Sequence, residues 1–99
     1  MSLSIDNMIQ GWFVGDFTPS AFKTDKCEIA IKKYLEGDIE PLHKHINADE
    51  IVCVLQGKVQ IQDIEFKPSE ISYVKVNEPT NLIALEDSVC LFIKFKYLR

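Results

Sequence analysis

The sequence predicts an all-β fold, a sandwich or barrel formed by a single domain. The chain has 99 residues, which is close to the common domain size of about 100–150 residues. Its apolar runs are short, rich in β-branched and aromatic residues, and separated by turn-forming residues at short intervals, as is typical of strands joined by turns. No long stretch has a helical period. We therefore expect residues 1–99 to form one β-barrel domain, in which residues 1–25 are an N-terminal strand or cap segment.

The strands follow one another with few residues between them. Gly57-Lys58 predicts a hairpin turn between two strands. Lys67 to Glu70 and Asn77 to Pro79 are interpreted as turns. The expected strands cover residues 26–35, 42–46, 50–56, 59–62, 63–66, 71–76, 81–85 and 88–95.

Two expected strand segments, residues 51–55 and 89–93, are apolar on both faces. One face of a strand in a small barrel normally meets water, so a further layer should cover these segments. The cover could be residues 8–22, whose aromatic cluster around Trp12 could also cap the barrel or line a ligand mouth. It could equally be a second copy of the chain. We expect a homodimer, because uncovered strands of this kind promote aggregation.

The charge pattern argues against binding to nucleic acid. The formal net charge is −4, and no cluster of basic residues offers contacts to a phosphate backbone. The only arginine is Arg99, the last residue, so no guanidinium inside the fold can bind a phosphate or carboxylate in bidentate fashion.

The three cysteines and the N-terminus indicate a cytoplasmic protein. Cys27, Cys53 and Cys90 lie far apart within apolar runs, which favours small core residues over a disulfide or zinc scaffold. Cys53 alternates with inward-facing neighbours and should point outward. The N-terminus lacks a signal-peptide pattern, and no run reaches the roughly 18–20 apolar residues of a membrane span, so we expect no membrane partner.

His43, His45 and Glu50 form the candidate site. The two histidines are the only ones in the chain. On a strand their imidazoles would share one face, and a turn after His45 would allow Glu50 to return to the same side. Two imidazoles and one carboxylate suit a first-row divalent metal and leave positions open for water or substrate. Without the carboxylate, two histidines would more simply be surface residues.

The spacing of this segment resembles the first motif of the cupin superfamily. It follows the pattern Gly37-x5-His43-x-His45-x4-Glu50-x6-Gly57. The resemblance extends as a pattern over residues 27–95 and implies a double-stranded β-helix, or jelly-roll barrel. It also implies that His43, His45 and Glu50 point into the barrel as metal ligands, and that Val52 and Val54 line the barrel beside them.

The second cupin motif is degenerate in this chain. The turn Pro68-Ser69-Glu70 has Glu where the family pattern has Gly or Asp. The position that would supply a further histidine falls on Thr80, whose neutral hydroxyl is a poor ligand for a divalent ion. We therefore expect a divalent metal, Zn, Ni, Mn or Fe, to be held only weakly at the three remaining ligands.

Three functions are compatible with these features. The chain could be a metal-dependent enzyme acting on a small molecule, in which Glu50 could double as a base. It could be a non-catalytic barrel that binds a small ligand. It could also be a structural dimer with a degenerate metal site. Apart from the three ligands, the hydroxyls of Tyr34, Tyr73 and Tyr97 could contact a ligand. The fold alone does not choose among these functions, and no catalytic residue or ligand is assigned.

Overall fold

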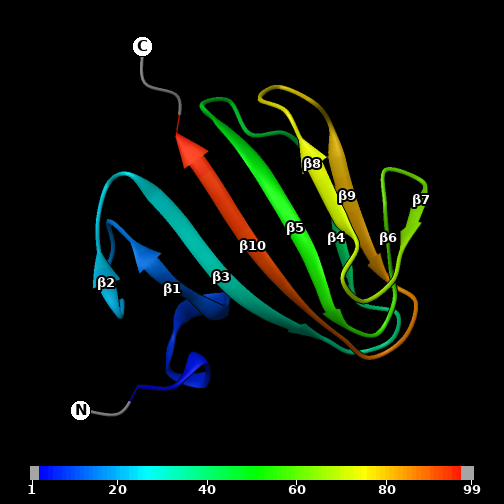
Figure 1. Cartoon of the computed structure of the whole chain (residues 1–99), viewed down its shortest axis with the longest axis horizontal. Coiled ribbons are helices and arrows are strands. Elements are labelled where there is room, and N and C mark those ends of the chain that lie inside the picture. The colour runs from blue at the N-terminus through cyan, green and yellow to red at the C-terminus, as the bar shows by residue number, and fades with distance from the viewer. Residues whose placement is uncertain (1–2, 97–99) are drawn as a thin grey trace.

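The computed structural model describes residues 3–96, which form two short 3-10 turns and ten strands (Figure 1). The two turns are η1 (Ile5–Asn7) and η2 (Ile9–Gly11). The strands are β1 (Trp12–Gly15), β2 (Phe22–Lys23), β3 (Cys27–Tyr34), β4 (Ile39–His43), β5 (Ala48–Gln56), β6 (Val59–Ile61), β7 (Ile64–Phe66), β8 (Ile71–Val74), β9 (Thr80–Ala84) and β10 (Ser88–Lys96).

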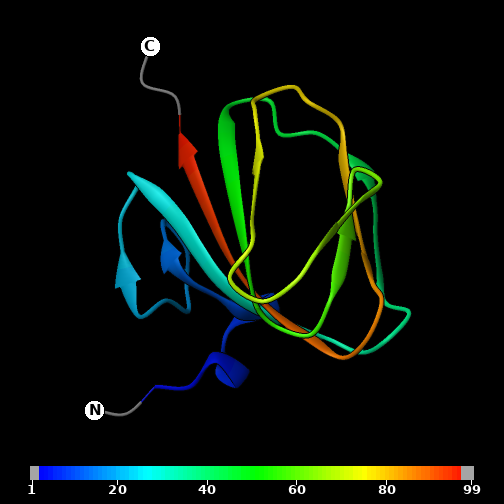
Figure 2. The same cartoon turned by 45° about the vertical axis from the view of Figure 1, so that its right-hand side comes forward.

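The strands form two sheets that enclose a barrel (Figure 2). The larger sheet has the order β2-β1-β3-β10-β5-β8, and the smaller has the order β4-β9-β6-β7. From β3 to β10 the chain passes repeatedly from one sheet to the other, and only β6 and β7 are consecutive within a sheet. This alternation is that of a jelly roll, so the predicted all-β barrel is confirmed.

The barrel core is built from alternate residues of the strands. On β5, Val52 and Val54 are buried, whereas Cys53 between them lies half-buried on the outer face. This confirms the predicted orientation of all three residues. The core cluster contains Ala30, Tyr34, Val52, Val54, Val59, Ile61, Leu82, Ala84, Cys90 and Phe92.

One predicted hairpin is wrong and another was missed. Gly57-Lys58 carries the chain from β5 in one sheet to β6 in the other, so it is a crossover between the sheets. The tight turn is Gln62-Asp63, which joins β6 to β7. Both residues have positive φ, 52° and 64°, as a type I′ turn requires. The sequence does not predict this turn, because the pair lacks the Asn-Gly or Asp-Gly signal typical of two-residue hairpins.

The end of the barrel where β5 finishes and β10 begins is tightly closed. A Cβ added to Gly57 would lie 2.3 Å from the carbonyl oxygen of Asp87, so the two backbones approach more closely than any side chain allows. The Oγ of Ser88 accepts a hydrogen bond from the Lys58 backbone N–H at 3.0 Å. The carboxylate of Asp87 accepts one from the Glu36 N–H at 2.8 Å. We call the opposite end, where β5 begins and β10 finishes, the mouth of the barrel; the cleft lined by His45, Ala48 and Lys94 lies there.

The N-terminal segment lengthens the larger sheet and does not cover its outer face. β1 pairs with β3 at the edge of the sheet, and in Figure 1 β1 and β2 lie beyond β3, away from β5 and β10. Trp12 packs against the inner core cluster. Of the two covers considered for the apolar strands, the N-terminal segment is therefore excluded.

Candidate functional site

His43 faces the barrel interior because β4 contains a bulge. Glu40 is paired with Leu82 and His43 with Thr80, so β4 uses one more residue than β9 over the same distance. Leu82 and Thr80 both point inward and are buried. The extra residue in the Pro41-Leu42 region therefore turns Glu40 and His43 to the same side, although three positions separate them.

His45 lies after the end of β4, so the prediction that both histidines share one strand is wrong. The two rings are nevertheless close, with centroids 5.0 Å apart in an edge-to-face arrangement. The loop that carries His45 is held from the β8–β9 loop, because the Asn77 N–H donates to the His45 carbonyl at 2.7 Å.

Glu50 and His45 meet at the mouth, as the predicted turn between them requires. The Nε2 of His45 lies 3.4 Å from an Oε of Glu50, and the Glu50 side chain is buried. This Nε2 is itself buried and has no hydrogen-bond partner in the described part of the chain. Burial lowers the pKa of His45, and the neighbouring Lys94 and His43 lower it further against the opposing effect of Glu50. A neutral imidazole with an unpartnered nitrogen is the form that coordinates metals.

His43 is oriented by its own strand. Its Nδ1 lies 2.8 Å from the Pro41 carbonyl oxygen, so Nδ1 carries the proton that it donates to this oxygen. The lone pair is then on Nε2, the arrangement found in many histidine ligands. His43 remains exposed. Within residues 3–96, no group of three His, Cys, Asp or Glu side chains is close enough to hold a metal ion. In the present side-chain arrangement His45 lies beside Glu50, and His43 is not close enough to complete a three-ligand group with them.

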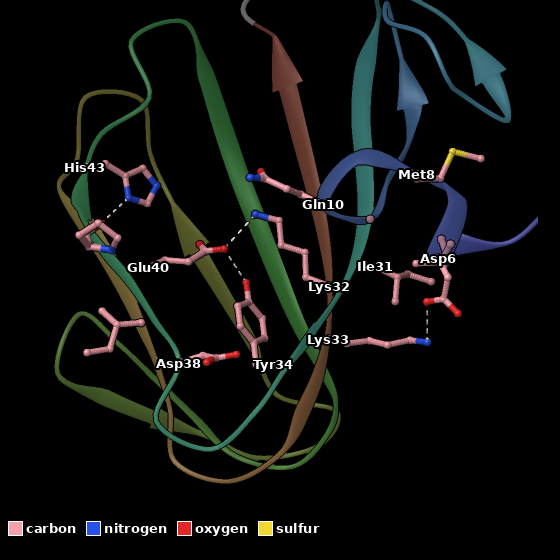
Figure 3. A pocket seen from close by; sticks show the side chains of 14 residues that line it. Asp6, Met8, Gln10, Ile31, Lys32, Lys33, Tyr34, Asp38, Glu40 and His43 are labelled. Atoms are coloured by element: carbon pink, nitrogen blue, oxygen red, sulfur yellow. Dashed lines mark hydrogen bonds and ion pairs between the residues drawn. The ribbon is translucent and has the colours of Figure 1, made fainter.

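A larger cleft borders His43 on one side (Figure 3). Its volume is about 750 Å³. From β3, Lys32 and Tyr34 reach across to the same carboxylate oxygen of Glu40 on β4, at 2.9 Å and 2.7 Å. These two hydrogen bonds join the sheets along an edge where β3 and β4 do not pair.

The pKa values of this cluster follow from its burial and its charges. Burial, together with the hydrogen bond to Glu40, raises the pKa of the Tyr34 hydroxyl. Burial alone would raise the pKa of Glu40, but the hydrogen bond from Tyr34 and the charge of Lys32 outweigh it and lower the pKa. At neutral pH the cluster is therefore a phenol and an ammonium held by one carboxylate.

Sequence reasoning missed several polar residues of the interior. The Tyr34 hydroxyl is among the predicted ligand contacts, whereas the sequence assigns no role to Lys32, Glu40 or Lys94. Pro41 is the signal that could have revealed Glu40, because proline within a strand often marks a bulge. Of the other tyrosines, Tyr73 lies exposed on β8 and donates to Asp49 at 2.6 Å, and Tyr97 lies outside the described residues.

The cysteines only partly follow the prediction. Cys90 is buried in the core cluster, as expected. Cys27 and Cys53 are half-buried, because they lie on the outer face of the larger sheet instead of in the core. The error for Cys27 arose because an apolar run does not show which face a residue occupies.

Comparison with known proteins identifies the fold. The sequence matches no known family model and no curated protein. Solved structures match well. KdgF from a Halomonas species has a TM-score of 0.70 at 20% identity, over 76% of this chain and 74% of that one. A cupin superfamily protein from Desulfitobacterium hafniense has a TM-score of 0.70 at 18% identity, over 75% and 71%. A cupin protein from Bacteroides fragilis has a TM-score of 0.63 at 22% identity, over 74% and 68%.

These likenesses, together with the jelly-roll topology, show that the chain has the fold of a small cupin barrel. The fold implied by the first-motif resemblance is thereby confirmed. No helix within residues 3–96 has the length and apolar character needed to span a lipid bilayer.

Proposed function

We propose that this chain is a cupin-type barrel that binds a divalent metal ion and a small molecule at its mouth. The observation that carries the proposal is the buried Nε2 of His45. It has no hydrogen-bond partner among residues 3–96 and lies beside the buried carboxylate of Glu50. An unsatisfied buried polar atom is costly, and a bound cation would relieve this cost. The donor set of two imidazoles and one carboxylate suits Zn, Ni, Mn or Fe.

Each ligand has a defined role in this proposal. Glu50 and His45 would hold the ion from the buried side of the mouth. His43 is exposed and would complete the set by turning its Nε2 toward them. A bound ion would act as a Lewis acid or lower the pKa of a bound water. With Thr80 in place of a fourth ligand, binding is weaker and more of the coordination sphere is left to water or substrate.

Metal analysis tests this proposal. After reconstitution with each of the four metals and removal of excess ion, we expect near-stoichiometric metal in the wild type and none in the His43→Ala/His45→Ala variant. Lys44→Ala is the matched control, since Lys44 lies exposed between the histidines, and it should keep its metal. A reconstituted wild type without metal would contradict the proposal.

The second candidate is a non-catalytic barrel that binds its ligand without metal. It is favoured by Lys94, which is paired with Glu50 in the β5–β10 ladder and so places a positive charge beside the metal ligands. Like charges repel strongly where water is partly excluded. A wild type that binds small anions but no metal would support this candidate.

We also propose that the chain forms a homodimer through the outer face of the larger sheet. Apolar residues lie side by side across β3, β10, β5 and β8 in two rows, Ile31-Leu91-Cys53-Ile71 and Ile29-Ile93-Ile51-Tyr73. Contiguous apolar faces of this kind mark association surfaces. A second copy is the simplest occupant, because the same face on both copies would be self-complementary.

A cytoplasmic location is also a proposal. It is supported by the three cysteine thiols, which are free and suit a reducing compartment. Cell fractionation with an antibody to the chain would test it, and recovery in an extracellular or periplasmic fraction would contradict it.

A further inference from the structure

A second, smaller cleft opens at the mouth on the other side of the histidine pair. Its volume is about 340 Å³, within the range of small-molecule sites. His45 belongs to this cleft and His43 to the larger one, so the two imidazoles stand between the clefts. The lining residues are Glu28, Lys44, His45, Ile46, Asn47, Ala48, Lys94 and Lys96.

Strand register places two of these lysines on the inner face. Lys94 pairs with Glu50 on β5, and Lys96 pairs with Ala48. Glu50 and Ala48 both point inward and are buried. Paired residues in adjacent strands share a face, so Lys94 and Lys96 point into the mouth. Both are half-buried.

Within residues 3–96 the lysines of this cleft form no ion pair, although Lys94 lies between Glu28 and Glu50 in the strand ladders. The ion pairs within residues 3–96 involve Lys32, Lys33, Lys58 and His45, and none involves Lys44, Lys94 or Lys96. The ammonium of Lys94 instead lies 4.7 Å from the centroid of the Trp12 ring, a cation–π contact that orients it without neutralising it. Three lysines and one glutamate line this cleft, although the chain as a whole has a net charge of −4.

The larger cleft provides a contrast. Its lysines are already paired, Lys32 with Glu40 at 2.9 Å and Lys33 with Asp6 at 3.1 Å. An anion entering there would have to displace a carboxylate of the protein. In the smaller cleft, three lysines face Glu28 and the adjoining Glu50, which leaves an excess of positive charge there.

We propose that the smaller cleft binds the anionic group, a carboxylate or phosphate, of a small molecule whose remainder reaches the His43–His45–Glu50 site. Lys94 and Lys96 supply the charge from within the mouth, and Lys44 adds to it from the rim. Lysine suits this role as a compact, strongly charged donor. The inference rests on the small-molecule site proposed above and names the chemical class of its ligand.

Fluorescence titration tests the cleft separately from the metal. Trp12 is the only tryptophan of the chain, so its emission reports on the Lys94 ammonium beside it. Chelator-treated protein is titrated with succinate and, separately, with inorganic phosphate, and the backbone amide shifts of Lys94 and Lys96 are followed by NMR. We expect saturable changes with at least one probe. Because charged hydrogen bonds to the anion are lost, Lys94→Gln or Lys96→Gln should weaken binding by roughly tenfold.

Lys67→Gln is the matched control, since Lys67 is exposed in the β7–β8 turn, away from the mouth. It should bind within about twofold of the wild type. Saturation by succinate identifies a carboxylate ligand, and saturation by phosphate alone identifies a phosphorylated one. Absence of saturation with both probes, or equal weakening in Lys94→Gln and Lys67→Gln, overturns the inference. Because the titration contains no metal, a failed metal analysis leaves its outcome unaffected.

Discussion

Thr80 lies directly across from His43 in the β4–β9 pair. Its side chain is 4% exposed and points into the barrel. Residues paired in this way have their Cβ atoms about 4.5–5.5 Å apart. A side chain longer than threonine at this position would therefore reach toward the same space as the His43 ring. This supports the assignment of Thr80 to the position that would carry a further histidine in the cupin pattern.

Restoring that histidine should strengthen metal binding. In Thr80→His a third imidazole joins the proposed set, and we expect the affinity for Zn²⁺ to rise by about tenfold or more. Competition with a chromophoric chelator measures the change. Lys67→His adds a histidine away from the mouth and should leave the affinity unchanged. Equal affinity in wild type and Thr80→His would show that Thr80 does not occupy the ligand position.

The stability of the metal-free protein should fall in mildly acidic solution because of His45. Burial lowers the pKa of His45 in the folded state, whereas in the unfolded chain it keeps its ordinary value of about 6.5. Below that pH the unfolded state binds more protons, so the free energy of unfolding decreases. Above the unfolded-state pKa of His45, the contribution of His45 to the free energy of unfolding does not change with pH.

Urea unfolding between pH 7.5 and 5.5 in the presence of a chelator measures this dependence. His45→Gln should flatten the profile, because the neutral amide does not titrate. The Lys44→Gln variant, which changes the neighbouring position, should keep the slope of the wild type. A wild-type profile as flat as that of His45→Gln would contradict the prediction.

The Glu40 carboxylate should contribute to the stability of the barrel. In Glu40→Gln the ammonium of Lys32, whose side chain is only 16% exposed, loses its charged partner. We expect the free energy of unfolding to fall by about 1–3 kcal/mol, the usual effect of leaving a partly buried charged group unpaired.

Asp6→Asn provides the matched control for Glu40→Gln. It breaks the Lys33–Asp6 ion pair, whose side chains are 61% and 72% exposed. Such surface pairs contribute about 0–1 kcal/mol. Chemical denaturation compares the two variants, and equal effects would show that Glu40 does not join the sheets as we infer.

The proposed dimer predicts a contrast between two exposed isoleucines. Ile71 on β8 belongs to the apolar rows of the outer face and is 60% exposed, whereas Ile64 on β7 is 58% exposed and lies in the other sheet. Ile71→Glu should dissociate the dimer, because a charge would be buried in the interface. Ile64→Glu should leave the dimer intact. Sedimentation at micromolar concentration measures both, and a monomeric wild type would refute the dimer.

The sequence was most informative where side chains alternate. The cupin resemblance implied that Val52 and Val54 point inward, and strand period then placed Cys53 on the outer face. The spacing of His43, His45 and Glu50 predicted the jelly-roll barrel through the same resemblance. His45 and Glu50 do approach one another.

The remaining interior residues depend on pairing between distant strands. Lys94 enters the mouth because β10 lies between β3 and β5, an order that local sequence does not encode. Glu40 joins Lys32 and Tyr34 only after two sheets come together. Gln62 adopts a left-handed turn conformation that glutamine does not favour, so tertiary pairing of β6 and β7 overrides the local preference there.

The bulge in β4 explains why Glu40 and His43, which are three positions apart, point to the same face of the strand. If the same residues paired regularly without the bulge, Glu40 and His43 would lie three positions apart in an alternating strand and would point to opposite faces. Either the link between the sheets or the imidazole at the mouth would be lost. A β4 without the bulge would therefore retain a strand but lose one of these two functions, so the irregular pairing matters as much as the identities of Glu40 and His43.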